Sequence, residues 1–73
     1  MKKVEIGSEI LVKLEDEEEW YKIIHSFEAD FLKNKISIDS PLAKAVLNHK
    51  EGEEISFRNP LGQKMLCKII KIK

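Results

Sequence analysis

The sequence has little of what disulfide-stabilised and membrane proteins need. Its 73 residues include a single cysteine, Cys67, which has no partner for an internal disulfide and so agrees with a reducing compartment. Apolar runs stay far short of the ~20 residues of a membrane span. The two lysines near the start are not followed by the hydrophobic core of a signal peptide. We expect a cytoplasmic protein that makes no use of a membrane.

Residue patterns typical of reaction centres are also missing. The three glycines stand at positions 7, 52 and 62, too far apart for a phosphate-binding loop. His25 and His49 lie in unrelated segments and, with Cys67, lack the local spacing of a zinc site. The serines show no nucleophile-elbow pattern. The sequence therefore predicts no cofactor, no metal site and no enzymatic activity.

Neither sign of charge is in excess. The chain has 13 basic and 13 acidic side chains, so it has no overall field that would attract polyphosphate, and we expect no nucleic-acid binding by bulk charge. Charged residues are 36 % and hydrophobic residues 42 % of the chain, as in a soluble globular domain. Its length predicts one domain over residues 1–73, with residues 1–8 as a lead-in before the core.

What the sequence does have is a compact central segment, residues 36–55, which reads ISIDSPLAKAVLNHKEGEEI. Ser40 is suited to cap a helix, and Pro41 to occupy its first position. Leu42, Ala45 and Val46 then form a short apolar stripe that we expect to face a sheet. Asn48 tolerates the left-handed backbone of a helix C-terminus. The segment predicts a strand, a short helix and a turn into another strand.

Alternating apolar residues predict strands on both sides of this segment. We expect strands over residues 9–15, 20–25, 54–58 and 64–72, with a packed connection over 26–35 and turns at 15–19 and 59–62. In the last strand, one face should carry Leu66, Ile70 and Ile72, and the other Met65, Cys67 and Ile69. This order predicts an α+β fold in which one short helix packs on one face of an antiparallel sheet.

The acidic run Glu15 to Glu19 allows two interpretations. Hard divalent cations need carboxylates that converge from a folded loop, and no glycine here makes such a turn. We therefore expect a solvated hairpin turn whose like charges also discourage edge-to-edge pairing. Trp20 and Ile24 share the outer face of the following strand, where they either cover a small sheet or line a surface for a partner.

Resemblance to a known family adds to these expectations. The segments VEIGSEILV, WYKIIHSFEAD, ISIDSPLAKAVL, EGEEISF and CKIIKI, in this order, resemble the C-terminal globular domain of the bacterial Gre transcript-cleavage factors. The most specific part is ISIDSPLAKAVL, and Glu28-Ala29-Asp30 matches a second landmark of the family. Asn48 and His25 depart from it, since family members usually have glycine at these places. The resemblance implies an FKBP-like fold and a part in transcription elongation.

The resemblance also implies a partner, RNA polymerase, bound through the coiled coil at the rim of its secondary channel. The matching positions are Asp39, Ser40, Pro41 and Leu42, with Asp30 as a further candidate. A proline at a helix start presents a rigid apolar edge, and Asp39 adds a hydrogen-bond acceptor beside it, so little ordering is needed on docking. Helix initiation alone explains Ser40 and Pro41 but not Asp39. We expect a monomer with no sequence-specific contact to nucleic acid.

Two alternatives stay open. A standalone Gre-like regulator would compete for the same polymerase site. A peptidyl-prolyl isomerase is suggested by the fold alone, and it would need a deep pocket lined by aromatic side chains. Because residues 1–8 leave no room for the acidic-tipped coiled coil of complete Gre factors, we expect no transcript-cleavage chemistry from this chain.

Overall fold

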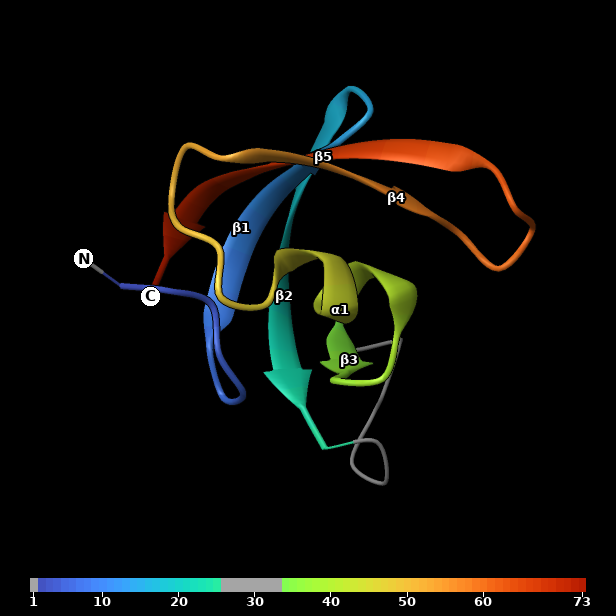
Figure 1. The fold of residues 1–73 in the computed structure, drawn as a ribbon. Helices are drawn as coiled ribbons and strands as arrows, with labels where there is room; N and C mark the ends of the chain where they lie inside the picture. The colour runs from blue at the N-terminus through green and yellow to red at the C-terminus, as the bar shows by residue number, and fades with distance from the viewer. Residues whose placement is uncertain (1, 26–33) are drawn as a thin grey trace.

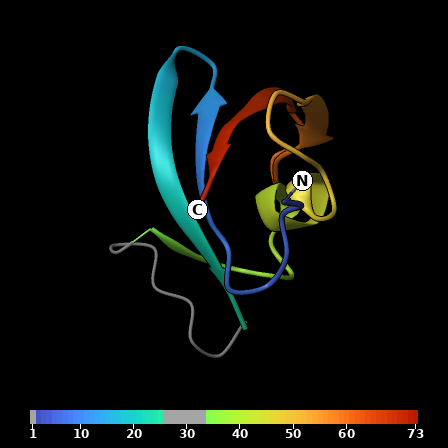
Figure 2. The ribbon, with the colours of Figure 1, turned by 90° about the vertical axis from the view of Figure 1, so that its left-hand side faces the viewer.

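The computed structural model describes residues 2–25 and 34–73. Its elements are five strands and one helix: β1 (Glu9–Leu14), β2 (Glu17–Ile24), β3 (Lys35–Ser37), α1 (Pro41–Val46), β4 (Glu54–Arg58) and β5 (Lys64–Ile72). The strands form one sheet in the order β3-β2-β1-β5-β4. Figures 1 and 2 show this sheet curling into an open half-barrel with α1 inside the curve. The α+β class with one short helix on one face of the sheet is thus confirmed.

The sheet differs from the predicted one in a single strand pair. β1 pairs with β2 and β5, and β4 with β5, all antiparallel, but β3 runs parallel to β2. Parallel neighbours need a crossover instead of a hairpin, and the chain makes it between Ile24 and Lys35. The predicted packed connection over 26–35 falls mostly on residues 26–33, which lie outside the described residues.

The β1–β2 hairpin is tighter than the sequence indicated. Its turn consists of Glu15 and Asp16, with Glu15 in the left-handed region at φ 58°, and Glu17 to Glu19 already belong to β2. The expected turn at 15–19 is therefore wrong in extent, although all five acidic side chains are exposed. Alternation of apolar and polar residues did not indicate a strand here, because side chains on both faces of this end of β2 are exposed to solvent.

The core lies between the sheet and α1. Its buried members are Val4, Ile10, Val12, Ile23, Ile36, Ala43, Val46, Cys67, Ile69 and Ile72. Two expectations about this set are wrong. The helix buries Ala43 and Val46, spaced i and i+3, whereas Ala45 stays partly exposed. Residues 2–8 are not outside the core, since Val4 is fully buried and exchanges backbone hydrogen bonds with the loop after α1.

A β-bulge changes the faces of β5. Leu11 pairs with Lys71 and Val12 with Ile69, so Ile70 is the extra residue on β5. The shift puts Ile72 in the core together with Ile69 and Cys67, instead of on the face of Leu66 as predicted. Strict alternation cannot foresee a bulge, because one inserted residue exchanges the faces of everything beyond it.

Within residues 2–25 and 34–73, no helix is long and apolar enough to cross a bilayer.

Candidate functional site

The predicted docking residues lie at the junction between β3 and α1, which is held by backbone hydrogen bonds. Ile38 N–H donates to the carbonyl oxygen of Ile24 in β2 at 2.8 Å, which fixes the start of the junction to the sheet. Ser40 N–H donates to the carbonyl oxygen of Ser37 at 2.9 Å. The Ser37 hydroxyl oxygen accepts a further bond from Asp39 N–H at 3.0 Å. The junction is therefore fixed at both of its ends.

Ser40 caps the helix as the sequence predicts. Its backbone is extended, at φ −71° and ψ 153°, and its hydroxyl oxygen accepts a hydrogen bond from Ala43 N–H at 3.2 Å. Pro41 follows in the first turn, where its missing N–H leaves no donor unpaired. At the other end, Asn48 adopts φ 66°, the left-handed conformation expected of it. The helix that lies between these two end signals is only six residues long.

The four adjacent candidates play different parts. Asp39 and Pro41 are exposed, whereas Ser40 is partly buried and engaged in capping. Leu42 is also partly buried and packs against the core. Among the described residues, no group donates a hydrogen bond to the Asp39 carboxylate or forms an ion pair with it. The junction thus presents a free acceptor beside an exposed proline ring. Asp30, the fifth candidate, lies outside the described residues.

Ser37 also holds the junction, although the sequence pattern did not indicate it. Its hydroxyl oxygen holds the backbone of Asp39, as a serine two residues before an amide commonly does in turns. The triplet Ser37-Ile38-Asp39 was therefore a usable signal. The alternating pattern, in contrast, indicates Ser37 only as part of the preceding strand.

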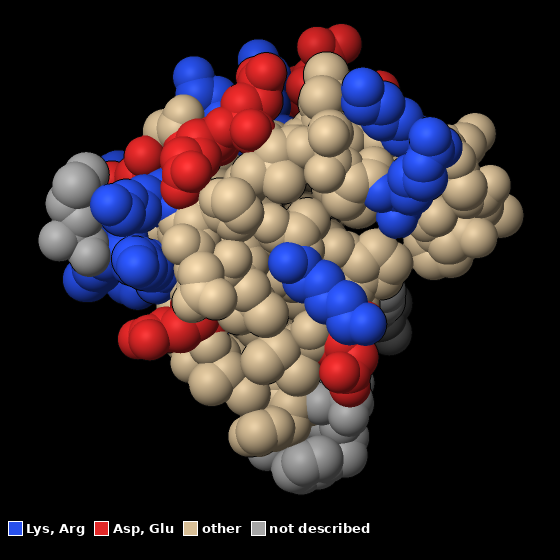
Figure 3. All heavy atoms as spheres, in the orientation of Figure 1, with Lys and Arg blue, Asp and Glu red and all other residues tan. Residues whose placement is uncertain are grey.

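The face around the junction has few charges at its centre. Figure 3 shows this face in the orientation of Figure 1, with uncharged side chains across most of its middle, one basic side chain near the centre, and acidic and basic groups around the edges. The one basic residue of α1 is Lys44, which is exposed. A partner that lies on this face would meet mainly uncharged surface bounded by charged groups.

The surroundings of the Cys67 thiol and the Tyr21 hydroxyl make both groups less acidic. Burial raises the pKa of the Cys67 thiol to about 11, so the thiolate that nucleophilic chemistry needs is scarce at neutral pH. Burial, and next the nearby Glu19 carboxylate, raises the pKa of the Tyr21 hydroxyl. No group of three or more His, Cys, Asp or Glu in residues 2–25 and 34–73 could hold a metal ion.

Side-chain contacts of Glu53 close the loop after the helix. His49 Nδ1 lies 3.2 Å from Glu53 Oε1, and the Lys50 amide donates to the same carboxylate. The bond from the Lys50 amide, and next the contact with His49, lowers the pKa of Glu53. The loop is thereby tied together where it leads from α1 into β4.

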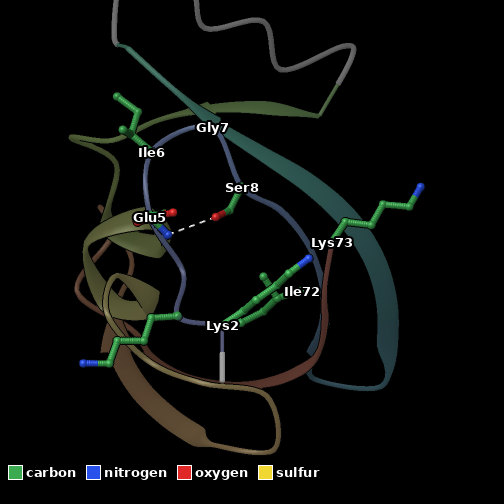
Figure 4. Close-up of a pocket in the computed structure, with 8 residues that line it drawn as sticks. Lys2, Glu5, Ile6, Gly7, Ser8, Ile72 and Lys73 are labelled. Atoms are coloured by element: carbon green, nitrogen blue, oxygen red, sulfur yellow. Dashed lines mark hydrogen bonds between the residues drawn. The ribbon is translucent and has the colours of Figure 1, made fainter.

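A hollow of about 610 Å³ lies elsewhere, between the lead-in and the end of β5. Figure 4 shows Glu5 and Ile6 on one side of it and Ile72 and Lys73 on the other, with Glu5 N–H donating to the Ser8 hydroxyl oxygen at 3.0 Å. Its lining has no aromatic side chain and no residue of the junction. It does not supply the aromatic pocket that a prolyl isomerase would need.

Comparison with known proteins identifies the family. All of residues 1–73 match the family described as "Transcription elongation factor, GreA/GreB, C-term". The chain is 49 % identical over 71 residues to transcription elongation factor GreA of Listeria monocytogenes serotype 4a, covering 94 % of this chain and 44 % of that protein. It is 43 % identical over 72 residues to GreA of Geobacillus kaustophilus, covering 96 % of this chain and 45 % of that protein. The chain thus spans less than half the length of these curated relatives.

Solved structures agree with the sequence relatives. The prokaryotic transcription elongation factor GreA/GreB from Nitrosomonas europaea superposes with a TM-score of 0.74 at 26 % identity, covering 96 % of this chain and 59 % of that one. The GreA factor homolog 1 (Gfh1) protein of Thermus thermophilus superposes with a TM-score of 0.81 at 28 % identity, covering 99 % of this chain and 49 % of that one. The match to the family over the whole sequence, together with these relatives, shows that the chain belongs to the GreA/GreB family of transcription elongation factors and corresponds to their C-terminal domain.

Proposed function

We propose that this domain docks onto RNA polymerase by binding the coiled coil at the rim of the secondary channel through the β3–α1 junction. Family membership supports polymerase as the partner, since the relatives are transcription elongation factors. The observation that carries the choice of site is the exposed Asp39 carboxylate, which lacks a partner among the described residues while its own backbone is fixed by Ser37. A fixed and unpaired acceptor is ready to accept from a basic or amide group of a partner.

The rigidity of the junction favours tight docking. Pro41 has a fixed φ, Ser40 is held by its capping bond, and Ile38 is bonded to β2. Binding therefore immobilises few side chains beyond those already ordered, which reduces the entropic penalty of association. Leu42 supplies apolar area next to Pro41 without leaving the core. In this proposal residues 1–73 act as one binding domain and carry out no catalysis.

Asp39→Ala tests the proposal in a titration of the purified chain against a peptide that comprises the polymerase rim coiled coil. Loss of one charged hydrogen-bonding group at an interface can cost about 2 kcal/mol, so we expect at least about tenfold weaker binding. An exposed polar side chain changes the free energy of unfolding by no more than about 0.5 kcal/mol, so melting should be unchanged.

Two further variants serve as controls. Asp16→Ala makes the same chemical change in the exposed β1–β2 turn and should leave affinity unchanged. Asp39→Asn keeps an acceptor oxygen and should recover part of the affinity. Equal binding by wild type and Asp39→Ala would remove Asp39 from the site. If the peptide binds none of the proteins, the docking proposal itself is wrong.

A further inference from the structure

The outward face of the sheet, opposite to α1, gathers basic side chains. Strand register places six lysines there from β1, β2, β5 and the residue after β5: Lys13, Lys22, Lys64, Lys68, Lys71 and Lys73. The sheet contributes three carboxylates to this face, Glu9, Glu18 and Glu54, and β4 adds one further basic residue, Arg58. Glu17 and Glu19 stand opposite inward-facing residues of β1. A chain with no net charge thus folds into a molecule with a basic sheet face.

An exposed aromatic ring stands among these lysines. Trp20 pairs with Leu11 across the β1–β2 ladder, and Leu11 pairs with Lys71 on its other side. The Trp20 side chain is 41 % exposed. A hollow of about 190 Å³ lies next to it, with Lys22 and Lys35 in its lining. The face therefore combines a flat apolar ring with cations on at least two sides.

Lys73 links this face to the chain ends. Its Nζ lies 5.1 Å from the centroid of the Trp20 ring and 3.8 Å from the Glu9 carboxylate, and its side chain is 69 % exposed. Lys73 also lines the hollow of Figure 4, to which Lys2 and Lys3 add two more ammonium groups. Basic surface thus continues from the sheet onto the lead-in.

We propose that this face binds single-stranded nucleic acid without sequence preference. Lysines recognise the phosphate backbone by charge, and an exposed tryptophan offers a surface on which any base can stack. Lys71 and Lys73 are two residues apart, which along a strand is about 6.6 Å, so they can contact neighbouring phosphates. The proposal is independent of the docking proposal, because it uses the opposite face of the molecule.

The contact of Lys73 with Trp20 is compatible with a stacked base. An exposed cation–π contact is weak compared with base stacking on an aromatic side chain, so a base can displace the ammonium group from the ring. The released ammonium group is then available to a phosphate. An acidic amphipathic helix would be a poorer ligand for this face. The exposed apolar groups Trp20 and Leu66 are separated by lysines and form no continuous stripe on which such a helix could pack.

Titration of the purified chain with a 12-nucleotide oligo-dT at low ionic strength tests the proposal. Trp20 is the only tryptophan, so stacking should quench the intrinsic fluorescence, with saturation at the same concentration as in the anisotropy of labelled oligonucleotide. Affinity should fall as salt is added, with a slope of log K against log salt of about −0.7 for each phosphate neutralised.

Matched variants locate the surface. Lys71→Glu should weaken binding about fivefold or more, whereas Lys44→Glu, the same change on α1, should alter it less than about twofold. Trp20→Leu should lose about fivefold or more in the anisotropy assay, because stacking is removed. Melting curves identify a variant that fails to fold, and the lysine pair still tests the face in that case.

Four results would overturn the inference. The first is no saturable quenching at low salt, and the second is equal weakening by Lys71→Glu and Lys44→Glu. The third is a DNA duplex of the same length that binds as tightly as the single strand, since a duplex offers phosphates but no free bases. The fourth is competition by polyglutamate of equal charge as effective as that by oligo-dT, which would indicate an acidic protein as partner.

Discussion

The inner and outer sides of the curled sheet differ in what packs on them and in the charges they carry. On the inner side, α1 and the β3–α1 junction cover the core, and side-chain hydroxyl groups hold the backbone of the junction. On the outer side, exposed lysines of β1, β2 and β5 surround the exposed Trp20. In the two proposals, the inner side binds its partner through a rigid junction, and the outer side binds through several positive charges around one aromatic ring.

This difference shows what a net charge conceals. Equal numbers of basic and acidic residues suggested that no field would attract a polyanion. Strand register then places basic residues at outward positions of β5 and keeps two acidic residues of β2, Glu17 and Glu19, on the other side of the strand. A bound ligand responds mainly to charges within about 10 Å, because salt screens the more distant charges of the molecule.

The largest expected effect is a loss of stability caused by a substitution in the core between the sheet and α1. Val46→Asp places a charge at a fully buried position with no partner, which should lower the free energy of unfolding by about 3–5 kcal/mol. Equilibrium denaturation with urea measures it. Both binding activities should be lost together, since each depends on the folded sheet.

Lys44→Asp on the exposed side of the same helix is the control for Val46→Asp, and it should shift the free energy of unfolding by no more than about 0.5 kcal/mol. A midpoint for Val46→Asp that equals the parent's would show that the buried side of α1 is assigned wrongly.

A smaller change should separate the two sides. Ser40→Ala removes the acceptor for Ala43 N–H, and loss of such a cap costs about 1 kcal/mol. Thermal melting of the variant measures this loss. We expect weaker binding of the polymerase peptide because the junction is less ordered, and unchanged quenching of Trp20 by oligo-dT. Equal losses in both assays would mean that the two sides are not independent.

The smallest effect concerns acid stability. The pKa of Glu53 is lowered by the Lys50 amide and by His49, so its folded-state pKa lies below the model-peptide value of 4.5. Its contribution to stability is therefore present above pH 4.5 and is lost as the pH falls through the lower, folded-state pKa. Denaturation of wild type and Glu53→Gln across pH 3 to 6 checks this. The two stability curves should converge at the acidic end, and parallel curves would exclude a role for Glu53.

Much of the fold was predictable because its signals are local. Ser40, Pro41 and Asn48 act on backbone within a few residues of themselves, so the start and end of α1 followed from their chemistry. The strands β4 and β5 and the turn between them also matched, since proline and glycine mark that turn. The junction residues 39–42 lie together for the simple reason that they are consecutive.

Contacts between distant segments decided the rest. The pairing of Val4 with the loop after α1, the parallel β2–β3 pair and the bulge at Ile70 join residues far apart in the chain, and no local pattern encodes them. The sequence by itself determined the helix caps, most of the strand positions and the place of Asp39 two residues before Pro41. Only the tertiary structure decided which side of the sheet each lysine occupies, because that depends on the register of strands that meet after folding.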